Sequence, residues 1–166
     1  MKDELTKVDI QKMQEEIDYR RLELAPKLRE ALKTARELGD LSENDEYRTA
    51  KRELGRNNSR IRYLQNMIAS AVVISSDSKD DEIGLFDIVT IYYDEDDEER
   101  DIRIVTTLRN DVMNGCISKE SPLGQALLGK KVGDTVTVTV NNYSYPVTVK
   151  KLVKGEDDPD LPISKY

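Results

Sequence analysis

The chain has 166 residues, enough for one ordinary domain or two small ones, and its 36% of charged residues indicate a large exposed surface. Its 37% of hydrophobic residues, with no Trp and one Phe, cannot fill one large core but fit a long helical hairpin joined to a small domain. The net charge of −7 argues against wrapping of free duplex DNA, and the absence of His excludes Ser–His, Cys–His and His–zinc chemistry.

The first 74 residues are predicted to form an antiparallel coiled-coil hairpin. Apolar residues recur at steps of three, four or seven along a first arm, at Ile10, Met13, Ile17, Leu24, Leu28, Ala31, Ala35 and Leu38. A second arm repeats the spacing at Tyr47, Ala50, Leu54, Asn57, Ile61, Leu64, Ile68 and Ala71. This spacing is typical of a coiled-coil seam. The position numbers of facing residues sum to 81 or 82, so the chain should turn near residue 41.

Several residues punctuate this predicted hairpin. Gly39 is placed to end the first helix in the left-handed region, and Asp40 or Ser42 to cap the second. Pro26 should kink the first arm because it lacks a backbone donor. Asn57 is expected on the seam opposite Leu24, where a polar residue fixes register more often than it binds a partner.

Charge is distributed unevenly along the hairpin. The tip, residues 39–46, holds four acids and no base, whereas residues 47–62 hold six bases and one acid. Arg48, Arg52 and Arg56 are four residues apart and therefore share one helix face. From the residues alone, a purely structural explanation is also open: the acids would cap a helix, and the arginines would keep the surface soluble.

Residues 82–154 are predicted to form a separate β-rich domain. Alternating apolar residues indicate strands at 88–92, 102–105, 135–140 and 145–149, and residues 121–129 a short helix started by Pro and stopped by Gly. The acid-rich residues 94–101 are interpreted as a solvated hairpin loop and not as a metal site. Residues 75–81 are expected to be a linker and residues 155–166 a mobile tail. The fold class is thus α+β.

The cellular setting is predicted from Cys116 and from hydropathy. Cys116 is the only cysteine, so no internal disulfide can form, and we expect it to be a small buried side chain in a reducing cytoplasm. No N-terminal apolar segment suggests export, and no stretch approaches the roughly 18 apolar residues of a membrane span. We therefore expect a soluble, cytoplasmic monomer without membrane association.

These residues resemble the GreA branch of the Gre family of bacterial transcript cleavage factors over roughly positions 8–152. The matching stretches are residues 35–44, 46–47, 83–86, 117–118, 120–124 and 126–134. Residues 35–44 are the most specific, because they fall at the tip that periodicity alone predicts. The resemblance implies an FKBP-like C-terminal domain, without implying prolyl isomerase activity.

The resemblance also implies a function exerted on RNA polymerase. The C-terminal domain would dock at the rim of the secondary channel of bacterial RNA polymerase, and the hairpin would reach toward the nascent RNA 3′ end. Asp40 and Glu43 match the family's catalytic tip acids, which help to hold a Mg²⁺ ion shared with the polymerase active site and not bound stably by the factor alone. Such a protein is not itself an enzyme, since it stimulates the polymerase's endonucleolytic activity in trans.

Further site residues follow from their places beside the tip acids. We expect Ser42, Asn44 and Tyr47 to support the tip, and Arg48, Arg52 and Arg56 to contact RNA or the channel wall. The family commonly has Ala where this chain has Asp45. The extra acid leaves open a polymerase-binding regulator or inhibitor of the same fold that does not stimulate cleavage. An unrelated coiled-coil adaptor would not bind polymerase, and a stand-alone nuclease would need further metal ligands.

Overall fold

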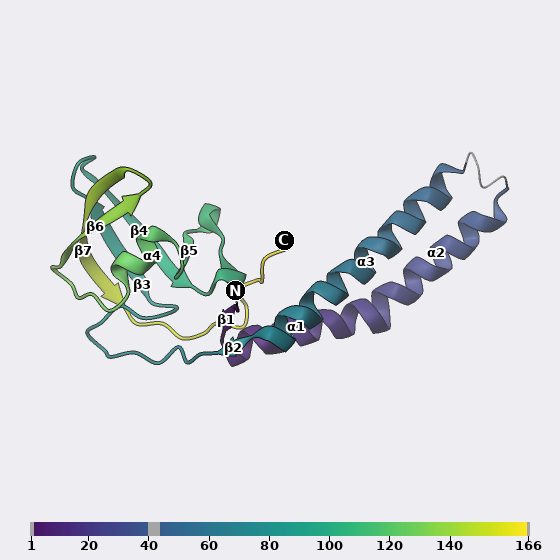
Figure 1. The fold of residues 1–166 in the computed structure, drawn as a ribbon, viewed down its shortest axis with the longest axis horizontal. Helices are drawn as coiled ribbons and strands as arrows, with labels where there is room; N and C mark the ends of the chain where they lie inside the picture. The colour runs from purple at the N-terminus through teal and green to yellow at the C-terminus, as the bar shows by residue number, and fades with distance from the viewer. Residues whose placement is uncertain (1, 40–43, 166) are drawn as a thin grey trace. The chain divides into compact units, whose positions relative to one another are not determined.

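The computed structural model describes residues 2–39 and 44–165, and its elements are labelled in Figure 1. Contacts divide the chain into two compact units. The hairpin unit is Ile10–Ala71, and the sheet unit combines Met1–Asp9 with Val72–Tyr166. Long helices make up the first unit and a mixed β-sheet dominates the second, which confirms the predicted α+β class. No helix within the described residues is both long enough and apolar enough to span a membrane.

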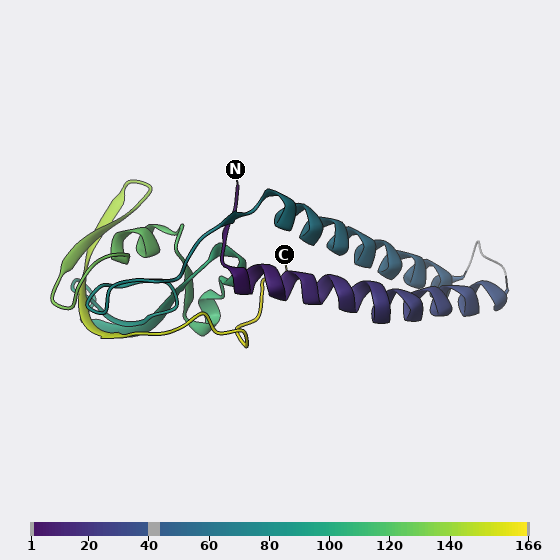
Figure 2. The same cartoon turned by 90° about the horizontal axis from the view of Figure 1, so that it is seen from below.

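The hairpin unit consists of two helical arms that lie side by side (Figure 2). The first arm comprises α1 (Lys7–Tyr19), a π-helical turn (Arg20–Leu24) and α2 (Ala25–Glu37). The second is the single helix α3 (Asp45–Ser70). Between them the chain reverses direction, as the two apolar series predict.

The π-helical turn changes which residues face the seam. The amide of Ala25 donates to the carbonyl oxygen of Arg20, five residues earlier, so this turn holds one residue more than an α-helical turn. One extra residue rotates the following helix by about 100° relative to the sequence pattern. Leu38 is consequently exposed, and its predicted place on the seam is wrong. Ala31 is also exposed, but it still lines the groove between the arms together with its predicted partner Ala50.

Beyond the turn the seam keeps two predicted residues and gains two others. Ala35 is buried and Leu28 is half-buried, as predicted, while Ala25 is buried and Leu32 half-buried although neither was predicted. The spacings of these residues fit one helix face. Pro26 lies in the first turn of α2, directly after the π-helical turn, and the first turn is the part of a helix that tolerates a residue without a backbone N–H. The sequence predicts an irregularity of the first arm at Pro26, and in the structure the arm is irregular at the π-helical turn just before this residue.

Asn57 belongs to a polar cluster on the seam. Its side chain is buried, donates to the carbonyl oxygen of Arg20 at 3.1 Å and accepts from Arg20 Nη1 at 3.0 Å. Arg20 is thus the hydrogen-bonding partner of Asn57, and Leu24, which was predicted opposite Asn57, is half-buried. Beside this pair, Glu16 accepts from Arg20 at 2.8 Å and from Arg60 at 2.7 Å. Polar bonds therefore join the two arms where the first arm is irregular.

The sheet unit is built on five strands in the order β5-β4-β3-β7-β6. These are β3 (Ile88–Tyr93), β4 (Glu98–Val105), β5 (Cys116–Ser118), β6 (Thr135–Val140) and β7 (Tyr143–Val153). All neighbours are antiparallel except β4 and β5. The short helix α4 (Pro122–Leu127) begins at Ser121, whose hydroxyl accepts from the amide of Gly124.

Three sequence expectations about this unit need correction. The acid-rich residues 94–101 are not all loop, because β4 already begins at Glu98. The three-residue strand β5 is too short to show alternation and was not predicted. Strand β1 (Glu4–Leu5) pairs in parallel with β2 (Val72–Val73), so residues 1–9 belong to the sheet unit and not to the hairpin.

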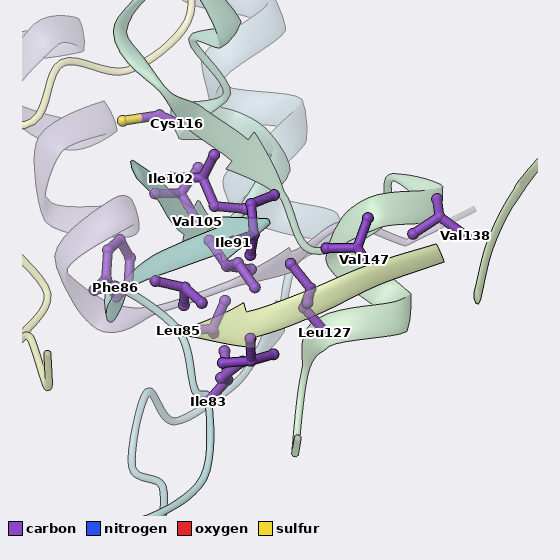
Figure 3. Close-up of a cluster of buried hydrophobic side chains, with 13 residues drawn as sticks. Ile83, Leu85, Phe86, Ile91, Ile102, Val105, Cys116, Leu127, Val138 and Val147 are labelled. Atoms are coloured by element: carbon purple, nitrogen blue, oxygen red, sulfur yellow. The ribbon is translucent and has the colours of Figure 1, made fainter. Parts of the chain in front are cut away.

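Buried side chains from the strands, α4 and residues 83–86 form the core of the sheet unit (Figure 3). Phe86 is fully buried, and Val89 and Ile91 follow it on the inward face of β3. Cys116 is buried, as predicted, and burial raises the pKa of its thiol.

The C-terminal residues also pack on the sheet unit. Leu161 contacts the core, and the amide of Ser164 donates to the carbonyl oxygen of Leu108 at 2.6 Å. The expectation of a mobile tail from residue 155 therefore differs from the structure. The polar composition of residues 155–166 gave no indication of the apolar contact at Leu161 or of the buried ionic contacts that this segment makes with Arg109.

Candidate functional site

The tip of the hairpin unit is the candidate site, and its first side is the end of α2. Leu38 ends the helix, and its amide donates to the carbonyl oxygen of Ala35 at 3.2 Å. Gly39 follows with φ 134°, in the positive range that favours glycine. The expected positive φ is present, although it lies beyond the left-handed helical value of about 57°.

Asn44 organises the second side of the tip. Its Oδ1 accepts from the amide of Tyr47 at 3.0 Å, and its Nδ2 donates to the carbonyl oxygen of Ala35 at 2.5 Å. A side-chain amide can do both because it carries an acceptor and a donor. Asn44 thus caps α3 and joins it to the last turn of α2. The predicted cap at Asp40 or Ser42 is wrong, because α3 begins only at Asp45.

Tyr47 and Arg36 make a second contact between the two arms. The Arg36 guanidinium carbon lies 5.7 Å from the centroid of the Tyr47 ring. A hydrogen bond from Arg36 is the main reason that the pKa of Tyr47 lies below its usual value, since a nearby positive charge favours the phenolate. Asn44 and Tyr47 thus both connect the arms beside residues 40–43.

Asp40, Ser42 and Glu43, three of the residues predicted at the tip, lie outside the described residues. The acids that follow them are Asp45 and Glu46, in the first turn of α3, where the helix dipole favours negative charge. The side chain of Asp45 is 94% exposed and pairs with Arg48 at 3.8 Å, a distance typical of a weak surface ion pair.

The predicted basic stripe lies on α3. Arg48, Arg52 and Arg56 are all exposed on the helix at intervals of four residues, as the sequence indicates. Arg52 and Arg56 form no ion pair with any residue that the structure describes. These two guanidinium groups are therefore available for contacts with anionic partners.

No metal-ligating group of three or more Asp, Glu, Cys or His residues is found among residues 2–39 and 44–165. This observation does not concern Asp40 and Glu43, which lie outside these ranges.

Comparison with known proteins relates both units to one family. The model described as transcription elongation factor, N-terminal, matches residues 4–73, and the model described as transcription elongation factor, GreA/GreB, C-term, matches residues 77–154. The chain is 41% identical to transcription elongation factor GreA of Thermotoga neapolitana over 134 residues, which cover 81% of this chain and 86% of that protein.

Two further similarities extend this comparison. Transcription elongation factor GreA of Streptococcus pneumoniae serotype 19F is 38% identical over 151 residues, covering 90% of this chain and 94% of that protein. Among solved structures, transcription factor Gfh1 aligns with 25% identity and a TM-score of 0.45, covering 92% of this chain and 97% of that chain.

Proposed function

Since the chain belongs to the GreA/GreB family of transcription elongation factors, we propose that it enters the secondary channel of bacterial RNA polymerase and stimulates cleavage of backtracked RNA. The sheet unit docks at the channel rim, and the hairpin carries its tip to the nascent RNA 3′ end. Cleavage by the polymerase then rescues arrested complexes. The observation that carries the proposal is the match of both units, residues 4–73 and 77–154, to the two family models. The bonds of Asn44 join α2 to α3 next to the segment that holds the tip acids.

The tip acids are assigned the chemical role. Asp40 and Glu43 offer carboxylate oxygens, the ligands that Mg²⁺ prefers. Two carboxylates leave most of its coordination positions to other groups, so the pair fits an ion shared with polymerase better than one held by the factor alone. When bound, the ion supplies Lewis-acid stabilisation of charge on phosphate oxygens.

The residues around the acids are assigned supporting roles. Asn44 holds the start of α3 against the end of α2, and Tyr47 with Arg36 holds the next turn. Both contacts limit the distance between the end of α2 and the start of α3, which residues 40–43 connect. Ser42 is proposed to help orient the neighbouring carboxylates. A pre-positioned pair of acids loses less entropy when it meets the ion.

A double variant tests the catalytic role. Asp40→Asn/Glu43→Gln should reduce RNA cleavage by orders of magnitude in a backtracked elongation complex with Mg²⁺, because the neutral amides no longer hold the ion. It should still compete with the unmodified protein for polymerase, because neither substitution changes the hairpin seam. RNA sizing and competition measure the two effects. Full cleavage by a folded, polymerase-bound double variant would reject these residues as the site.

Asp45→Ala is the matched acid control. The Asp45 side chain is 94% exposed and its ion pair with Arg48 is a weak surface contact, so its removal should leave stability nearly unchanged. Cleavage should be preserved or should rise if Asp45 takes no part. If the unmodified protein cleaves nothing and Asp45→Ala creates cleavage, the protein is an inhibitor of the same fold instead.

The basic stripe is proposed to contact RNA phosphates or acidic channel walls. Replacing Arg48, Arg52 and Arg56 with Gln should weaken functional binding to polymerase, with the larger loss at low salt, where exposed charges are less screened. Titration of cleavage against protein concentration at two salt concentrations measures the effect. An unchanged concentration dependence at low salt would limit the three arginines to solubility.

A further inference from the structure

A small cavity lies at one end of the sheet, separate from the residues used above. It has a volume of about 160 Å³ and is lined by Tyr93, Glu95, Asp96, Tyr143, Tyr145 and Pro146. We call this group the tyrosine pocket. Its walls come from the ends of β3 and β7 and from the β3–β4 turn, and the hydroxyl of Tyr143 joins them by donating to Glu95 at 2.6 Å.

The three tyrosine rings form a row. The centroids of Tyr93 and Tyr145 are 6.0 Å apart, those of Tyr143 and Tyr145 are 5.9 Å apart, and the ring planes differ by 30° and 26°. Tyr93 and Tyr145 pack their inner edges against the core, whereas Tyr143 is 60% exposed. Each stacked pair turns ring faces toward each other, so the face that the row offers at the surface is the outer face of the exposed Tyr143.

Charge makes the pocket selective for cations. The electron-rich faces of the rings attract positive groups, and Glu95 and Asp96 stand on the same wall. Burial raises the pKa of Tyr93 and Tyr145, and the hydrogen bond to Glu95 raises that of Tyr143, so the phenols stay neutral in ordinary buffers. The adjoining residues 94–101 contain seven acids and one Arg, which would repel nucleic acid.

The opposite face of the same hairpin holds a comparable site that the chain fills itself. Tyr92 donates to Asp97 at 2.6 Å, and the Lys150 ammonium lies 5.1 Å from the centroid of the Tyr92 ring. No Lys or Arg is among the residues that line the tyrosine pocket. One of its rings, Tyr93, has the guanidinium carbon of Arg100 5.8 Å from its centroid, and Arg100 also pairs with Glu98 at 3.1 Å. The exposed ring of Tyr143 is therefore the main aromatic surface for a further cation.

We propose that the tyrosine pocket binds the guanidinium group of an arginine projecting from a basic segment of a partner protein. The planar guanidinium stacks on aromatic faces while its fork of donors reaches a carboxylate, which a compact ammonium cannot do equally well. The volume is below the roughly 300–1,000 Å³ of sites for whole small molecules, so it suits the end of one side chain. Residues 94–101 attract further positive charges of the same segment.

The test uses the full-length protein with ¹³C-labelled tyrosine. A short peptide of alternating Arg and Gly is titrated while the ring signals are followed by NMR, in parallel with peptides in which citrulline or Lys replaces Arg. The Arg peptide should shift the signals of Tyr93, Tyr143 and Tyr145 in a saturable way. The citrulline peptide, equal in shape but neutral, should bind at least about fivefold more weakly, and the Lys peptide should also bind more weakly.

Single-residue variants test whether the Arg peptide binds at the tyrosine pocket. Tyr143→Leu and Glu95→Gln change exposed side chains, so both should fold, and each should weaken Arg-peptide binding about fivefold. Tyr92→Leu, on the opposite face, is the matched control and should leave the affinity unchanged. Equal binding of the citrulline or Lys peptide, equal losses for Tyr92→Leu and Tyr143→Leu, or no saturable shift would each overturn the proposal. The result is independent of the proposed tip function, because Asp40 and Glu43 take no part in it.

Discussion

Arginine side chains meet carboxylates in both units, but at different depths. In the hairpin unit, Arg60 and Arg20 bind Glu16 with side chains that remain 11%, 27% and 23% exposed, in that order. In the sheet unit, Arg109 is fully buried. Water can still reach the first cluster if one member is removed, but it cannot easily reach the second. The same ionic contact is therefore far more costly to break in the sheet unit.

The buried cluster ties three parts of the sheet unit together. Arg109 Nε lies 2.7 Å from Asp9, its Nη2 lies 2.6 Å from Asp157, and its Nη1 donates to the carbonyl oxygen of Asp158 at 2.7 Å. Its guanidinium carbon also lies 5.2 Å from the centroid of Phe86. One side chain thus joins Asp9 and the C-terminal segment, both parts of the sheet unit, to its core residue Phe86.

Arg109→Met gives the largest stability effect that this comparison predicts. The substitution leaves the carboxylates of Asp9 and Asp157 buried without their cation, which should cost about 3–5 kcal/mol of unfolding free energy in the sheet unit. Denaturant dependence of amide hydrogen exchange in β3 and β4 measures it. Arg100→Met is the control, because Arg100 is 61% exposed and should cost at most about 1 kcal/mol. Similar losses of unfolding free energy for Arg109→Met and Arg100→Met would contradict the conclusion that burial makes the Arg109 contacts more costly to break.

The two units also differ in their apolar cores. The core of the sheet unit comprises the buried residues shown in Figure 3, whereas the large apolar side chains buried in the hairpin unit are Met13, Ile17, Ile61 and Leu64. The buried alanines of the seam let the helices approach closely but contribute little area. Each large seam residue should therefore matter strongly.

Leu64→Ala tests this dependence. Leu64 is fully buried, so its truncation should lower the unfolding free energy of the hairpin unit by about 2–4 kcal/mol. Helical circular dichroism during denaturation measures the loss, and hydrogen exchange in β3 should stay unchanged. Leu22→Ala is the control: Leu22 is 72% exposed, and the expected change is within about 0.5 kcal/mol. A loss for Leu22→Ala as large as that for Leu64→Ala would reject the seam described here.

The reversal of the hairpin was predictable because it depends on periodicity, which many residues share. The change beyond Leu24 was not, because the heptad pattern continues through Leu38, whereas in the structure Leu38 is exposed and Ala25 and Leu32 join the seam after the π turn. The role of Arg109 was also hidden. A single Arg in a polar stretch has no sequence signal for burial when its carboxylate partners are 100 and 48 positions away, the difference in numbers from Asp9 and Asp157.

The residues of the candidate site also divide into those whose positions the sequence predicted and those it did not. The positions of Arg48, Arg52 and Arg56 follow from helical spacing, and their exposure is as expected. The cap at Asn44 was missed because Asp40 and Ser42 are equally good capping residues, and only the point at which α3 begins decides among them. Asp40 and Glu43 are assigned by family resemblance, since spacing alone cannot distinguish a catalytic acid from a capping one.

Glu16 gives the smallest predicted effect, and it depends on pH. Burial by itself would raise the pKa of Glu16, but hydrogen bonds from Arg60 and Arg20 outweigh it and hold the pKa below the ordinary value of 4.5. A carboxyl group whose pKa is lower in the folded state stabilises that state above the unfolded pKa. This contribution is lost as the pH falls below about 4.5 and through the lower folded pKa.

Denaturation of the unmodified protein and of Glu16→Gln at a series of pH values measures this contribution. The stability difference between them should be constant near neutral pH, at most about 1 kcal/mol because the pair remains partly exposed, and should shrink at acidic pH. Glu15→Gln is the control, since Glu15 is exposed and accepts a hydrogen bond from Gln11, a neutral neighbour on the same helix. If Glu16→Gln and the unmodified protein lost stability in parallel as the pH fell, the arginine contacts of Glu16 would not stabilise the hairpin unit.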